Sequence, residues 1–172
     1  MDKIDIKNKT LIDWICGKGI WNKKGIQPSR NKEESKWGCS LINKNSKMWS
    51  ACLGETIVKE LLENQGEKVW RPKKINGFQP DLETEEFIYE VKTRNWTTNG
   101  TAGEKILGVG YKYADIPELY GKNLKIVLVG YQEYEASNKF ELFEPKSENR
   151  RKIIQLLKEI GIEYIKCSDL II

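Results

Sequence analysis

The sequence predicts a single α/β (α+β) domain in which helices flank a central mixed β-sheet. Two observations carry this prediction: apolar residues recur at helical spacing over 54–63, and runs rich in β-branched and aromatic residues occupy 87–91 and 124–129. The 172 residues, 39% of them hydrophobic, suffice for one core but not for two domains of ordinary size. We expect a basic region over 1–50, a catalytic core over 51–135 and a C-terminal helix and strand over 136–172.

A helix and a β-hairpin are the first elements predicted. Apolar residues at 57, 58, 61 and 62 predict a helix over 54–63, with Glu55 in its first turn. The runs 68–71 and 87–91 indicate two strands of a hairpin, with turn residues at Asn76-Gly77 and over 83–86 between them. Asp81 follows Pro80, which cannot donate a ladder hydrogen bond, so Asp81 is expected at the end of the preceding strand.

The second half of the chain continues the alternation of helices and strands. Residues 102–120 indicate a helix broken near Pro117, and 124–129 indicate a buried strand. Residues 148–172 predict an amphipathic helix and then a strand over 162–165, packed on the sheet. The tyrosines over 111–120 are expected to be packed aromatics, with a dimer or DNA contact as the alternative.

Asp81, Glu90 and Lys92 form the candidate site. Asp81 lies nine positions before Glu90, on the neighbouring strand of the predicted hairpin. Side chains alternate between the two faces of a strand, so Glu90 and Lys92 point to one side while Val91 points into the core. Two carboxylates and a lysine brought together in this way would form a site for a hard cation beside an amine that can handle protons.

The residue types at this site predict phosphodiester hydrolysis. Mg²⁺ prefers oxygen ligands and usually takes one or two protein carboxylates, which leaves positions for water and phosphate oxygens. A metal held in this way polarises a phosphoryl group and lowers the pKa of a bound water. Lys92 could orient or deprotonate the attacking water, or offset the charge that develops on the phosphorus oxygens.

The pattern resembles the signature of the PD-(D/E)XK nuclease superfamily: Pro80-Asp81, an eight-residue spacer, then Glu90-Val91-Lys92. The predicted order of helix, three strands, helix and strand resembles the αβββαβ core of that superfamily, the restriction-endonuclease-like fold. The resemblance implies a set of site residues: Asp81, Glu90 and the Val91 carbonyl as ligands of Mg²⁺, with Lys92 and Glu55 as further catalytic residues. On the alternative interpretation, these are ordinary charged residues of a solvated strand face and a turn.

Composition excludes several other classes of hydrolase. The chain has no histidine, which excludes His-metal nucleases, Ser-His-Asp hydrolases and zinc sites with histidine ligands. Its four cysteines show no CxxC spacing. The N-terminal residues are charged, and no apolar run approaches the roughly 18 residues of a membrane span. We therefore expect a cytoplasmic protein with reduced thiols that does not enter a membrane.

Two segments are candidates for DNA contact. In the first, residues 1–50, basic residues outnumber acidic ones and tryptophans are interleaved with them, although the net charge of the whole chain is only +4. There we expect phosphate contacts from Lys23, Lys24, Arg30 and Lys36. The alternative is a small helical cap whose tryptophans are core and whose lysines are solvated.

The second segment, residues 93–105, directly follows the candidate strand and is rich in hydroxyl, amide and glycine residues. Such side chains suit phosphate and base-edge contacts. The residues expected to contact DNA here are Arg94, Asn95, Trp96, Thr97, Thr98, Asn99, Thr101 and Lys105. An ordinary turn followed by a helix cap is the alternative.

The resemblance and the short chain together favour a compact type II restriction endonuclease, a site-specific deoxyribonuclease acting on double-stranded DNA. A homodimer would match the two-fold symmetry of the duplex, and a cognate DNA methyltransferase is a further candidate partner. The alternatives are a Holliday junction resolvase or a repair nicking enzyme. A second alternative is a non-catalytic DNA-binding module that keeps a nuclease-like fold.

Overall fold

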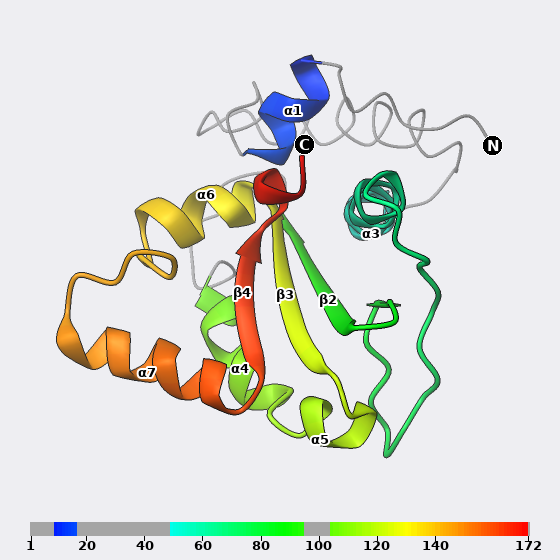
Figure 1. Cartoon of the computed structure of the whole chain (residues 1–172). Helices are drawn as coiled ribbons and strands as arrows, with labels where there is room; N and C mark the ends of the chain where they lie inside the picture. The colour runs from blue at the N-terminus through cyan, green and yellow to red at the C-terminus, as the bar shows by residue number, and fades with distance from the viewer. Residues whose placement is uncertain (1–8, 17–48, 95–103, 172) are drawn as a thin grey trace.

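The computed structural model describes residues 9–16, 49–94 and 104–171 (Figure 1). A central sheet runs through the middle of the molecule, and helices lie on both of its sides. The elements in chain order are α1 (Lys9–Ile15), α3 (Trp49–Asn64), β1 (Leu82–Glu83), β2 (Phe87–Arg94), the 3₁₀ helix η2 (Glu104–Gly108), α4 (Val109–Lys112), α5 (Ile116–Tyr120), β3 (Asn123–Gly130), α6 (Tyr131–Asn138), α7 (Glu148–Glu159), β4 (Ile162–Lys166) and the 3₁₀ helix η3 (Cys167–Leu170).

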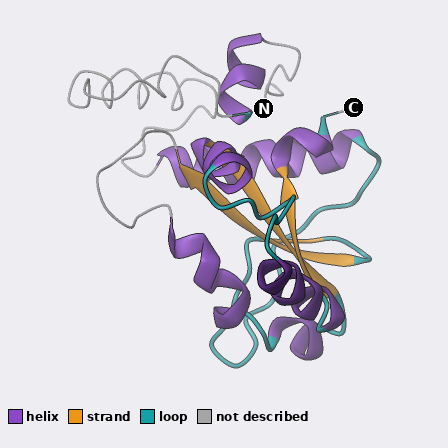
Figure 2. Cartoon of the chain, turned by 90° about the vertical axis from the view of Figure 1, so that its left-hand side faces the viewer, coloured by secondary structure: helices purple, strands orange, loops and turns teal. Residues whose placement is uncertain are grey.

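The sheet has four strands in the order β1-β2-β3-β4. β1 is antiparallel to β2, whereas β2 and β3, and β3 and β4, are parallel. Figure 2 shows helices on both sides of this sheet. The predicted class, an α+β domain with a mixed sheet flanked by helices, is confirmed.

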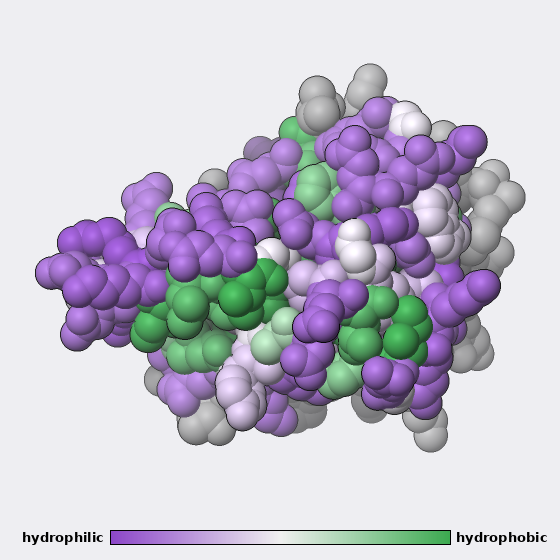
Figure 3. Space-filling view, turned by 60° about the horizontal axis from the view of Figure 1, so that its bottom comes forward, coloured by the Kyte–Doolittle hydropathy of each residue, from purple (hydrophilic) through white to green (hydrophobic). Residues whose placement is uncertain are grey.

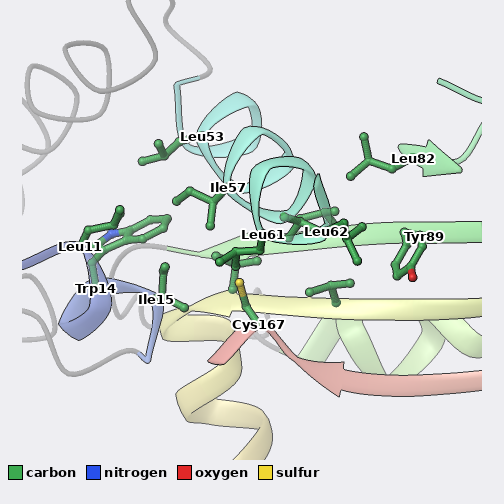
Figure 4. Close-up of a cluster of buried hydrophobic side chains, with 14 residues drawn as sticks. Leu11, Trp14, Ile15, Leu53, Ile57, Leu61, Leu62, Leu82, Tyr89 and Cys167 are labelled. Atoms are coloured by element: carbon green, nitrogen blue, oxygen red, sulfur yellow. The ribbon is translucent and has the colours of Figure 1, made fainter. Parts of the chain in front are cut away.

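Separate apolar clusters cover the two faces of the sheet. On one face, α3 packs its buried leucines and isoleucines against Tyr89 and Val91 of β2, and α1 and Cys167 complete the cluster (Figure 4). On the other face, Ile88 of β2 joins residues of η2, α4, α5 and α6. Because neighbouring residues of β2 point to opposite faces, Glu90 and Lys92 share a side with Ile88. The candidate residues therefore face the short helices, not α3.

Helix α3 begins earlier than the sequence indicates. The apolar spacing predicts a helix over 54–63, but Gly54 lies inside the helix, which begins at Trp49. A Cβ at this position would lie 1.9 Å from Thr93 Oγ1, so glycine lets α3 approach β2 closely. The prediction of Glu55 in the first turn is therefore wrong; it lies in the second turn.

The predicted hairpin has a different first strand. Residues 68–71 contribute one antiparallel bridge, Trp70 to Glu83, and Pro72 then prevents the ladder from continuing. The partner of β2 is the two-residue strand β1. Asp81 comes immediately before β1, so its predicted place at the end of a preceding strand is wrong. The tight turn predicted at Asn76-Gly77 is confirmed, with positive φ at both residues.

The elements predicted for the second half of the chain are present, but the helix predicted over 102–120 is divided into more pieces. Residues 104–120 form three short helices, and Pro117 lies in the first turn of α5, where its missing N–H costs no hydrogen bond. The predicted strand over 124–129 is β3, and all of its residues except Asn123 and Lys125 are buried. The predicted C-terminal helix and strand are α7 and β4, and β4 hydrogen-bonds to β3 as part of the same sheet.

Candidate active site

Asp81 is joined to β2 by its backbone and its side chain. Its N–H donates to the Tyr89 carbonyl at 3.1 Å, which extends the β1–β2 ladder by one residue. Its Oδ2 accepts a hydrogen bond from the Val91 N–H at 2.7 Å. These two bonds hold the Asp81 carboxylate beside the middle of β2.

The same contacts fix the direction of the Val91 carbonyl. In an extended strand, the N–H and the C=O of one residue point to the same edge. The Val91 N–H points to the edge where Asp81 lies, so the Val91 carbonyl points to that edge as well. A carboxylate oxygen and a carbonyl oxygen are thereby directed to one side of β2.

Glu90, Lys92 and Tyr113 form a connected group on one face of β2. The Lys92 ammonium makes an ion pair with Glu90 Oε1. The same oxygen accepts a hydrogen bond from the Tyr113 hydroxyl at 2.8 Å. Lys92 Nζ also lies 5.8 Å from the centre of the Tyr113 ring. The Glu90 side chain is 5% exposed and that of Lys92 is 31% exposed, so the lysine is the member of the pair that reaches solvent.

Tyr113 is a site residue that the sequence reasoning missed. It lies 23 positions after Glu90, at the C-cap of α4, and nothing in the sequence distinguishes it from the other tyrosines over 111–120. No spacing rule connects it to the strand. One signal could have found it: the helical segment predicted after the candidate strand packs on the face of the sheet to which Glu90 points.

Burial, together with neighbouring carboxylates, raises the pKa of Asp81 from 3.8 to about 7. Burial is the largest cause, and the negative charges of Glu90 and Glu55 add to it. The hydrogen bond from Val91 and the charge of Lys92 act in the opposite direction. Glu55, on α3, is therefore close enough to the site to act on Asp81 through its charge.

The donor set fits a hard divalent cation. Asp81, Glu90 and the Val91 carbonyl offer oxygen ligands alone, which is the chemistry that Mg²⁺ prefers. A cation beside Asp81 would also offset the repulsion that raises the pKa of this carboxyl group. In the described part of the chain, no three His, Cys, Asp or Glu side chains are grouped as a metal site. The third ligand here would be a backbone carbonyl, so two carboxylates suffice for the proposed arrangement.

Of the expected DNA contacts, the structure describes Arg94 and Lys105. Arg94 is directed at α6, where it makes an ion pair with Glu135 and lies 5.6 Å from the centre of the Tyr131 ring. Lys105 is exposed on η2. The other expected contacts lie outside the described residues: Asn95, Trp96, Thr97, Thr98, Asn99, Thr101, Lys23, Lys24, Arg30 and Lys36.

Comparisons with known protein families, with curated proteins and with solved structures gave no match. Within residues 9–16, 49–94 and 104–171, no helix has the length and apolar character needed to cross a membrane. The geometry around Asp81, Glu90 and Lys92 is thus the main guide to function.

Proposed function

We propose that the chain is a Mg²⁺-dependent endonuclease with a restriction-endonuclease-like core of the PD-(D/E)XK type. The observation that carries the proposal is the arrangement of Asp81, Glu90 and Lys92 on β2 and the chain just before β1. Asp81 and the Val91 backbone are directly hydrogen-bonded, and Lys92 is ion-paired to Glu90. The order of α3, the bridge at Trp70, β1, β2, short helices and β3 supports it as a reduced αβββαβ core.

In this proposal, the ligands of Mg²⁺ are Asp81, Glu90 and the Val91 carbonyl. The bound cation would supply polarisation of the scissile phosphodiester and a lowered pKa of a coordinated water. Lys92 reaches solvent beside these ligands, where its ammonium orients the attacking water or offsets the charge of the transition state. Burial and the adjacent Glu90 charge raise the pKa of Tyr113, so its hydroxyl remains protonated and holds Glu90 as a donor.

The proposed substrate is double-stranded DNA, and the proposed class is a type II restriction endonuclease. The carboxylates at this site repel an anionic backbone unless a cation intervenes, so their retention in close contact favours catalysis over simple binding. A homodimer would present one site to each strand of the duplex. A cognate methyltransferase would then protect the same sequence in host DNA.

The decisive experiment incubates the purified chain with long unmethylated duplex DNA and Mg²⁺, beside an EDTA control and the Asp81→Asn variant. Discrete bands that require Mg²⁺ and disappear in Asp81→Asn are the expected result. Intact duplex combined with cleavage of a four-way junction would replace the restriction proposal by a resolvase. Metal-independent DNA binding that becomes tighter in Asp81→Asn, without cleavage of either DNA, would identify a binding module instead.

A further inference from the structure

Helix α7 exposes a stripe of large aliphatic side chains. Ile153 is 59% exposed, Leu156 is 58% exposed and Ile160, at the C-cap of the helix, is 41% exposed. Ile154 and Leu157, on the neighbouring face of α7, pack instead against the apolar cluster on β3 and β4. The helix therefore has more apolar surface than its own domain uses.

The spacing of this stripe is that of a helix-pairing seam. Asn149, Ile153, Leu156 and Ile160 are separated by four, three and four residues, which matches alternating d and a positions of a heptad. A groove of about 270 Å³ adjoins the stripe, between α7 and η2, and Leu107, Phe140, Ile153 and Leu157 are among its lining residues. Figure 3, which brings the bottom of the view in Figure 1 forward, shows patches of apolar side chains between hydrophilic ones on this face of the molecule. Several large apolar side chains exposed along one helix are typical of a protein–protein interface.

The charges beside the stripe identify the partner. Lys152 and Glu159 occupy the two g positions that flank the same side of the seam. When two copies of α7 pack antiparallel about a two-fold axis near Leu156, residues equally far before and after the centre face each other. Lys152 of each copy then faces Glu159 of the other, which gives two symmetric ion pairs. A parallel pair would instead place Lys152 opposite the apolar Leu157.

We propose that the α7 stripe, formed by Ile153, Leu156 and Ile160, is the surface on which a second copy of this chain docks with its own α7 antiparallel. Lys152 and Glu159 can both form these ion pairs between copies, because their present contacts lie on the exposed surface of the helix. Lys152 now pairs with Glu148 at 2.7 Å, but these side chains are 71% and 72% exposed, and such helix-surface pairs contribute little. Glu159 accepts a hydrogen bond from the Gln155 amide at 3.1 Å on the exposed side of the helix.

The inference gives the homodimer of the proposed function an interface, and it can fail while that function stands, because oligomeric state is measured without DNA. The test is sedimentation equilibrium of the full chain over a concentration series. We expect wild-type protein to be dimeric and Leu156→Glu to be monomeric. Tyr111→Glu, which places the same charge on an exposed residue of α4 outside the stripe, is the matched control and should remain dimeric. Thermal melts of each variant confirm that it is folded.

A charge exchange tests the antiparallel geometry. Lys152→Glu and Glu159→Lys should each raise the dimer dissociation constant about tenfold, because each places like charges opposite one another twice. The double variant, Lys152→Glu with Glu159→Lys, should return the constant to near the wild-type value. A monomeric wild type, a dimer that persists in Leu156→Glu, or a double variant no tighter than the single variants would each overturn the proposal. In that case another partner or another surface of the chain covers the stripe.

Discussion

The hydroxyl of Tyr113 donates a hydrogen bond to Glu90 Oε1, the same oxygen that pairs with the Lys92 ammonium. One carboxylate oxygen thus receives two donors, which leaves Oε2 as the Glu90 oxygen with the greater capacity for a cation. Tyr113 lies on the helical segment that covers the candidate face, so the packing of that segment sets the orientation of Glu90. In the proposed enzyme, Tyr113 is a positioning residue.

Tyr113→Phe should weaken the site without disturbing the fold. Loss of a hydrogen bond to a charged group costs about 1.5 to 3 kcal/mol, so we expect a cleavage rate about ten to a hundred times lower at limiting Mg²⁺. Part of this loss should be recovered at high Mg²⁺, because a mobile Glu90 binds the cation less tightly. Cleavage measured against Mg²⁺ concentration checks this. Tyr111→Phe is the control, since Tyr111 is 90% exposed on the same helix.

Stability without divalent metal should fall as the pH rises from 4 to 8. The pKa of Asp81 is about 7 in the folded chain against an ordinary value of 3.8, so the fold favours the protonated carboxyl group. This contribution is fully present below about pH 4 and is lost as the pH passes through 7. A shift of this size corresponds to at most about 4 kcal/mol. Urea unfolding across this pH range measures the loss.

Two comparisons assign this loss to Asp81. Asp81→Asn should flatten the pH profile and exceed wild type in stability at pH 8. Mg²⁺ should raise the melting temperature of wild type at pH 8 more than at pH 5, and should leave Asp81→Asn almost unchanged. A wild-type profile as flat as that of the variant would show that Asp81 titrates in its ordinary range.

Lys92→Ala should separate catalysis from binding. If Lys92 acts on the attacking water while the carboxylates hold Mg²⁺, cleavage should fall by about 10² or more, and Mg²⁺-assisted DNA binding should change little. Cleavage assays and fluorescence anisotropy on the same duplex check this. Lys112→Ala is the control, because Lys112 Nζ also lies 4.8 Å from the centre of the Tyr113 ring, whereas the ion pair of Glu90 in the described part of the chain is with Lys92. Equal loss of binding and cleavage would contradict the assignment.

Arg94→Ala should destabilise the fold. The Arg94 and Glu135 side chains are 11% and 9% exposed, so removal of the guanidinium leaves a buried carboxylate without its ion-pair partner. We expect the free energy of unfolding to fall by about 3 kcal/mol, with partial recovery in Arg94→Ala combined with Glu135→Ala. Urea titration measures both. Unchanged stability with weaker DNA binding would instead support the expected role of Arg94 in DNA contact.

Local patterns in the sequence predicted much of the fold. The apolar spacing of 57, 58, 61 and 62 identified α3, and the β-branched runs identified β2 and β3, because burial imposes those periods directly. The same alternation placed Glu90 and Lys92 on one face of β2. These features depend on residues that are close together in the sequence, so a single sequence is enough to predict them.

The features that the sequence did not predict depend on contacts between distant segments. Residues 68–71 have the composition of a strand, but Pro72 and the pairing of β1 with β2 reduce them to one bridge. The close approach of Gly54 to Thr93 joins a helix and a strand that are far apart in the sequence. Tyr113 reaches Glu90 through the packing of α4, which no local pattern encodes.

The close packing at Gly54 has a consequence for the chemistry. Glu55 follows Gly54 directly in α3, and its charge acts on Asp81 across the space between the helix and β2. Any side chain at position 54 would collide with Thr93 and lift α3 from the strand. Because Glu55 follows in the same helix, its separation from Asp81 depends on this close packing, and an alanine at position 54 would weaken one of the smaller contributions to the raised pKa of Asp81.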